Sequence, residues 1–72
     1  MYRTTDIILA SYLRCEGFAL IGIEKNDTKK CTFVFPDDVH DRVSEFDLGT
    51  AQVEPVEFNN YVKQLTTSAR RA

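Results

Sequence analysis

The sequence predicts a small α+β domain, in which an antiparallel β-hairpin packs against three short helices in the order α-β-β-α-α. Three observations lead to this prediction: helical spacing of apolar residues near the amino terminus, two β-rich runs around a polar turn, and helical spacing again in two later segments. With 72 residues, 43% of them hydrophobic, the chain suits a single domain over 1–72. We expect an ordered core over residues 4–66 and a frayed tail over 67–72.

The first element is expected to be a helix over residues 5–16. Apolar side chains there recur at spacings of three and four, which places them on one helix face. They are Ile8, Leu9, Tyr12 and Leu13. Thr4 or Thr5 can cap the start of the helix, where Asp6 suits the positive end of the helix dipole. Gly17 suits the left-handed residue that ends a helix.

The hairpin is expected next, with strands over 18–25 and 29–35. Both segments are rich in β-branched and aromatic residues, and the polar Asn26-Asp27 pair between them favours a turn. Pro36 ends the second strand, because proline cannot donate a backbone hydrogen bond to the sheet.

Two helices are expected to follow the hairpin. Pro36-Asp37-Asp38 introduces the first, with an aspartate as its cap, and Leu48-Gly49 ends it. Glu54-Pro55 begins the second, because proline is tolerated at the first helical position. In each helix three apolar residues recur at i, i+4 and i+7. They are Val39, Val43 and Phe46 in the first helix, and Phe58, Val62 and Leu65 in the second.

The first predicted strand is apolar on both faces, although a hairpin covered on one side should alternate apolar and polar residues. Because an isolated two-stranded sheet is only marginally stable in water, both faces need a cover. Either the three helices of the same chain cover both faces, or a second copy covers one of them, and we expect a homodimer. The candidate interface residues are Phe18, Leu20, Ile21, Ile23, Phe33 and Phe35.

The net charge of −2 argues against a protein that binds nucleic acid through a generally basic surface. The one strong local imbalance is acidic, because residues 36–49 hold one arginine against five acids. Two basic pairs remain as candidate phosphate contacts, Lys29-Lys30 and Arg70-Arg71. The alternative function is therefore a nucleic-acid-binding accessory protein, in which a dimer brings basic pairs from two chains together.

No pattern in the sequence predicts an enzyme, a cofactor or a metal site. The glycines form no phosphate-binding loop, and one histidine with two distant cysteines does not supply a zinc ligand set. Asp37, His40 and Asp41 could share one helical face and hold a cation, but acids at a helix start more simply favour the helix dipole. The acidic segment could also imitate nucleic acid as a decoy. Its acids are Asp37, Asp38, Asp41, Glu45 and Asp47.

Cysteine content and the amino terminus bear on the cellular compartment. Cys15 and Cys31 are too few for a disulfide framework, and we expect both to be buried as small apolar residues. The start of the chain lacks the charged-then-apolar order of a signal peptide, and the longest apolar run, Phe18–Ile23, is too short to span a membrane. We therefore expect a cytoplasmic protein.

Several short motifs carry a resemblance that spans residues 3–66. Thr4-Thr5-Asp6 precedes the first helix, Gly17 precedes the hairpin, Thr32-Phe33-Val34-Phe35 forms its second strand, and Val53-Glu54-Pro55 begins the last helix. The chain thereby resembles a family of short proteins of unknown function from bacteria and their phages, in which the last motif is Val-Asp-Pro. The resemblance implies a prokaryotic or viral cytosolic setting, but no ligand and no catalytic residue.

These observations favour a non-enzymatic protein-interaction module that self-associates and binds a protein partner through its hairpin or a helix surface. The apolar first strand is the main support for this hypothesis, because an uncovered apolar face marks an interaction surface.

Overall fold

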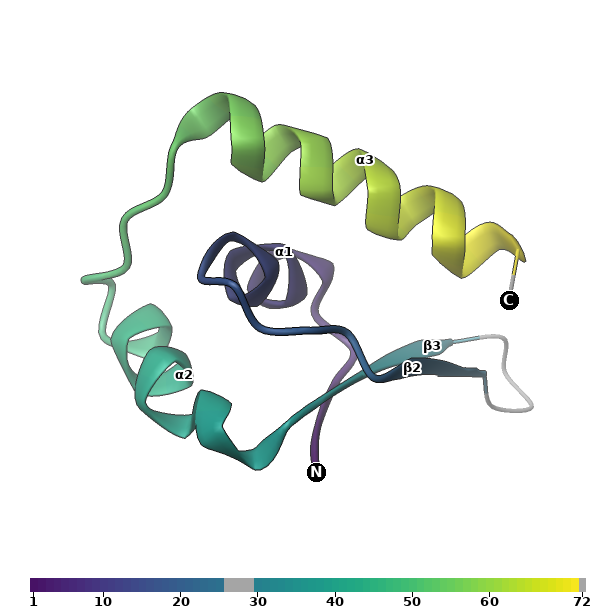
Figure 1. Cartoon of the computed structure of the whole chain (residues 1–72), viewed down its shortest axis with the longest axis horizontal. Helices are drawn as coiled ribbons and strands as arrows, with labels where there is room; N and C mark the ends of the chain where they lie inside the picture. Colours follow the sequence, from purple (N-terminus) through teal and green to yellow (C-terminus); the bar gives the residue numbers. More distant parts are fainter. Residues whose placement is uncertain (26–29, 72) are drawn as a thin grey trace.

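The structure, a computed structural model, describes residues 1–25 and 30–71 and has the α+β architecture that the sequence predicts (Figure 1). Its elements follow the order β-α-β-β-α-α, and the three strands form one antiparallel sheet with the order β1-β3-β2. The elements are β1 (Tyr2–Thr4), α1 (Ile7–Cys15), β2 (Gly22–Lys25), β3 (Cys31–Phe35), a 3-10 turn (Asp37–Val39), α2 (His40–Asp47) and α3 (Pro55–Arg71).

Strand β1 is an element that the sequence analysis missed. It pairs with the far end of β3, so that Tyr2 lies opposite Phe35 and Thr4 lies opposite Phe33. The predicted threonine cap is also wrong, because Asp6 caps α1. Its Oδ1 accepts hydrogen bonds from the backbone N–H groups of Ile8 at 2.9 Å and of the next residue at 3.4 Å. The chain therefore leaves the sheet and enters the helix within two residues.

The predicted first strand is shorter than expected, because residues 18–21 form a linker and only Gly22–Lys25 lie in the sheet. The linker is held by backbone hydrogen bonds from Phe18 N to Leu13 O at 3.2 Å and from Ile21 N to Val34 O at 2.8 Å. The doubly apolar strand predicted over 18–25 is thus not formed, because its most apolar residues lie in the linker ahead of β2. Position 29, the expected start of the second strand, lies outside the described residues; Cys31 begins it instead.

The two faces of the sheet have different covers. On the inner face, Phe33 and Phe35 of the central strand β3 pack against α1 in the core. On the outer face, Val34 is only 4% exposed. Arg3 of β1 lies opposite Val34, and its Nε lies 3.1 Å from Oε1 of Glu24 in the other edge strand, β2. The ion pair therefore crosses β3 on the outer face of the sheet.

The core gathers around α1, which lies between α3 and the sheet in Figure 1. Helix α1 contributes consecutive buried residues because both the sheet and the other helices pack on it. The buried members of the core are Leu9, Ala10, Tyr12, Leu13, Phe33, Phe35, Val39 and Leu65. Helix α1 packs against β1, α2 and α3, which lie in different parts of the sequence. It therefore connects these elements in one core.

Helix α2 begins differently from the prediction. A 3-10 turn precedes it, and neither the turn nor the helix has an N-cap side chain that accepts a hydrogen bond from its first N–H groups. Val39, which is fully buried, anchors this turn in the core. Gly49 ends the helix with a φ of 76°, as its position predicts.

Helix α3 begins as predicted and ends later than predicted. The Glu54 carboxylate accepts hydrogen bonds from the backbone N–H groups of Val56 at 3.1 Å and Glu57 at 2.6 Å, so it caps the helix ahead of Pro55. The helix continues to Arg71, past residue 66 where the ordered core was expected to end. Ala69 packs against the core and holds this last turn in place.

Gly17 adopts a φ of 92° in the tight exit from α1, a backbone conformation that costs an L-residue about 1–2 kcal/mol. We expect Gly17→Ala to lower the free energy of unfolding by that amount, as measured by urea denaturation followed by circular dichroism. Gly22→Ala is the matched control, because Gly22 has ordinary strand geometry and open space around its Cβ position. Equal effects of the two substitutions would contradict this account of Gly17.

Candidate nucleic-acid interface

Lys30 and the Arg70-Arg71 pair lie at the same end of the molecule. The Cys31 thiol donates a hydrogen bond to the Ala69 carbonyl at 3.6 Å, which joins the start of β3 to the last turn of α3. Lys30 precedes Cys31, and Arg70 follows Ala69, so both side chains leave the backbone beside this contact. In Figure 1 the carboxyl end of α3 lies on the same side of the molecule as the start of β3.

A third lysine joins them from the neighbouring strand. Lys25 lies directly opposite Cys31 in the register of β2 and β3. We define the basic end as the four described cationic residues around the Cys31–Ala69 contact. They are Lys25, Lys30, Arg70 and Arg71, and all four are exposed. Lys29, the remaining candidate phosphate contact, lies outside the described residues.

Acidic residues gather at the opposite end of the molecule. We define the acidic end as the five acids of the 3-10 turn and α2, which are Asp37, Asp38, Asp41, Glu45 and Asp47. The longest dimension of the domain is 34 Å, and α2 and the carboxyl end of α3 lie toward opposite ends of it in Figure 1. Although the net charge is only −2, acidic and basic residues are concentrated toward opposite ends of the domain.

Two of the residues considered for a cation site, Asp37 and His40, instead contact other groups of the protein. Asp37 forms an ion pair with the amino terminus, whose nitrogen lies 2.6 Å from Oδ1. The hydrogen bond and positive charge of the amino terminus hold the pKa of the Asp37 carboxyl below its usual range. The His40 ring packs edge-on against the Tyr2 ring, with centroids 5.7 Å apart. Across residues 1–25 and 30–71, no group of three or more suitable side chains could hold a metal ion.

One acid of α2 has a structural role. Glu45 accepts a hydrogen bond at 3.4 Å from the hydroxyl of Tyr12, which also donates at 3.0 Å to Glu16. Burial and these two carboxylates raise the pKa of Tyr12 to about 12, so the hydroxyl keeps its proton. Arg42 lies 3.1 Å from the same Glu45 carboxylate. The side chain of Glu45 thus fastens α2 to α1, which leaves it poorly suited to a decoy surface.

The six candidate interface residues do not form one exposed surface. Phe33 and Phe35 lie in the core at 2% and 0% exposure, so their assignment to an interface is wrong. Phe18, Leu20 and Ile23 are partly buried and pack against the core of their own chain. Only Ile21 is substantially exposed, at 49%. Self-association stays a prediction, but the doubly apolar strand that favoured it is absent.

Both cysteines are free thiols and only partly buried, which corrects the expectation of full burial. Burial together with Glu57, Glu16 and Glu54 raises the pKa of the Cys15 thiol, so this group is a poor nucleophile at neutral pH. Cys31 instead makes the contact with Ala69 that assembles the basic end.

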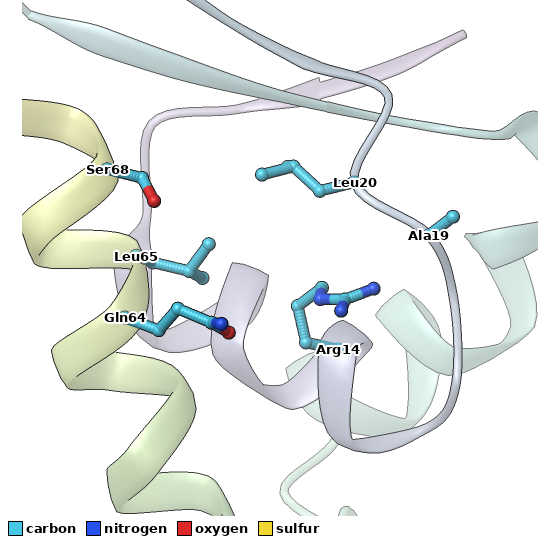
Figure 2. A pocket seen from close by; sticks show the side chains of 6 residues that line it. All are labelled: Arg14, Ala19, Leu20, Gln64, Leu65 and Ser68. Carbon is cyan, nitrogen blue, oxygen red and sulfur yellow. The ribbon is translucent and has the colours of Figure 1, made fainter. Parts of the chain in front are cut away.

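A pocket that the sequence analysis did not find adjoins the basic end. It has a volume of about 300 Å³ and lies between α1, the 18–21 linker and α3. Figure 2 shows Arg14 reaching from α1, Leu20 from the linker, and Gln64 and Ser68 from α3 toward one space. Ala19 and Leu65 complete the lining. No local pattern could have indicated this pocket, because three separate segments build it.

Comparison with known proteins places the chain in a family. The family model described as "Domain of unknown function (DUF5659)" matches residues 1–70, nearly the whole chain. The chain belongs to this family. The resemblance to an uncharacterised family is therefore confirmed, and the DUF5659 model covers the pocket and all of the basic end except Arg71. No curated protein and no solved structure matches the chain. Among the described residues, no helix of this family member is long and apolar enough to cross a membrane.

Proposed function

We propose that this domain is a non-enzymatic accessory protein that binds nucleic acid, with the basic end in contact with phosphates. The observation that carries the proposal is the Cys31–Ala69 contact, which brings Lys25, Lys30, Arg70 and Arg71 together in one chain. The sequence alone suggested such a concentration only between the two chains of a dimer. One copy already supplies four cations within a small surface.

The overall negative charge is compatible with this function because charge acts locally in salt solution. At physiological ionic strength, charges are screened over about 8 Å. The domain is 34 Å long, with the acidic and basic ends toward opposite ends of that axis. A phosphate at the basic end therefore interacts mainly with the four cations there. The acid nearest in sequence to Lys25 among the described residues, Glu24, is neutralised by its ion pair with Arg3.

The position of Arg70 and Arg71 favours contact with an extended partner. Both side chains project from the last turn of a 17-residue helix, and neither is part of a described ion pair. Arginine presents several N–H donors in a planar arrangement that suits phosphate oxygens. Lys25 and Lys30 on the hairpin lie on the other side of the Cys31–Ala69 contact. The four residues can thus contact successive phosphates of one strand.

Salt dependence of binding tests the proposal. We expect labelled single-stranded and duplex DNA of random sequence to bind at low salt, as measured by fluorescence anisotropy. Four phosphate contacts predict that log K falls with log salt at a slope of about −3 for a single strand and slightly steeper for duplex. Absence of binding at low salt, or binding that does not weaken as salt rises, would refute the proposed function.

A further inference from the structure

We infer that the pocket between α1, the 18–21 linker and α3 receives one unpaired base of a single-stranded nucleic acid whose phosphates lie on the basic end. This inference rests on the proposed function and names the form of nucleic acid that the domain prefers. It depends on three features of the pocket: its continuity with the basic end, its mixed lining, and the fixed position of its arginine.

The pocket is continuous with the basic end along α3. Gln64, Ser68 and Arg71 lie at i, i+4 and i+7, so they follow one face of the helix. Ser68 lines the pocket, and the next residue, Ala69, accepts the hydrogen bond from Cys31 that marks the basic end. A strand that places its phosphates near Arg71 therefore has a neighbouring base within reach of Ser68.

The lining matches what a base requires. A nucleobase has two apolar faces and an edge with hydrogen-bond donors and acceptors. Leu20 and Leu65 offer aliphatic contact for the faces. Gln64 supplies both an amide donor and a carbonyl acceptor, and Ser68 supplies a hydroxyl that can do either. Figure 2 shows the Gln64 and Ser68 side chains directed from α3 toward the space that Leu20 borders. The volume of about 300 Å³ is at the lower end of the range for small-ligand sites.

Arg14 is held in place before any ligand arrives. Its Nη1 donates a hydrogen bond to the Phe18 carbonyl at 2.8 Å, and its guanidinium carbon lies 5.2 Å from the centre of the Tyr61 ring. No carboxylate within residues 1–25 and 30–71 forms an ion pair with it. Guanidinium groups carry five N–H donors, so others remain for a phosphate oxygen or a base carbonyl. The arginine thus adds a fixed positive charge at the far side of the pocket.

A base can use this pocket only when it is unpaired. In a duplex, both the faces and the pairing edge of each base are occupied by neighbours, and extruding a base is unfavourable. The basic end contacts phosphates of either form, whereas only a single strand gains additional contacts in the pocket. The inference therefore predicts tighter binding of a single strand than of a duplex of equal charge at the same salt concentration.

The test compares the Gln64→Ala/Ser68→Ala double variant with the unchanged chain, using single-stranded and duplex DNA in the anisotropy assay. Alanine preserves the helix, and circular dichroism confirms the fold. We expect the dissociation constant for the single strand to rise about fivefold or more, and that for the duplex to change less than about twofold. Asn59→Ala/Thr67→Ala is the matched control, because it removes an amide and a hydroxyl from exposed positions of α3 away from the pocket.

The outcomes separate the inference from the proposed function. If the double variant lost affinity equally for both forms of DNA, or lost none for the single strand, the base pocket would be overturned. Binding that still weakened with salt would in that case continue to support the basic end. An equal loss in the Asn59→Ala/Thr67→Ala control would also overturn it, because the effect would then belong to the helix rather than to the pocket. Absence of binding to either form would refute both.

Discussion

Replacing Phe35 with alanine is expected to unfold the domain. Phe35 is fully buried in the central strand β3, opposite Tyr2 of β1 and within the core around α1. A buried phenylalanine truncated to alanine costs about 3–5 kcal/mol, because apolar contacts are lost and a cavity remains. A single core of this size rarely supplies more than about 3–5 kcal/mol of net stability. The substitution therefore removes most or all of the folding free energy.

Thermal and urea denaturation followed by circular dichroism measure this effect. Ile21→Ala is the matched control, since Ile21 is also apolar and belongs to the same predicted interface set, but is 49% exposed. We expect it to change the free energy of unfolding by less than about 1 kcal/mol. A folded Phe35→Ala variant with near-normal stability would mean that the core around α1 does not hold the fold as described.

The double substitution Arg70→Gln/Arg71→Gln is expected to weaken nucleic-acid binding on the order of a hundredfold at low salt. Each lost phosphate contact removes about 0.7 from the slope of log K against log salt for a single strand, which near 0.05 M corresponds to roughly tenfold in affinity. The slope should therefore fall by about 1.4 as well. Both side chains are exposed, so the fold should persist with a small loss from the weaker interaction with the helix dipole.

Anisotropy titrations across a salt series measure both quantities. Arg42→Gln is the matched control for a single charge, because Arg42 lies in α2 at the acidic end and pairs with Glu45. It should leave the slope unchanged. A loss with Arg42→Gln that matches the loss with a single Arg70→Gln variant would show that net charge, rather than the basic end, governs binding.

Elements with a clear local pattern could be predicted from the sequence. The spacing of apolar residues located all three helices, and Gly49 and Glu54-Pro55 marked the boundaries of two of them. Strand β1 could not be predicted in this way, because three residues carry no measurable periodicity. It becomes a strand through its pairing with β3, some thirty residues along the chain.

The apolar run before β2 was predicted to be a strand for a related reason. Phe18 and Leu20 are apolar because a linker folds them against the core, rather than because a strand presents two apolar faces. The candidate site shows the same limitation. Lys30 and Arg70 are forty residues apart, and the contact of Cys31 with Ala69 in the folded chain brings them together. Contacts between distant segments also build the pocket at Arg14, which no local motif indicates.

The most direct test of the central claim is a map of the binding surface by nuclear magnetic resonance. Single-stranded DNA would be titrated at low salt into the isotopically labelled chain, with amide chemical shifts followed residue by residue. We predict that the shifts concentrate at Lys25, Lys30, Cys31 and the last turn of α3, and leave α2 unchanged. Shifts centred on α2, or no shifts at all, would contradict the assignment of the basic end as the nucleic-acid interface.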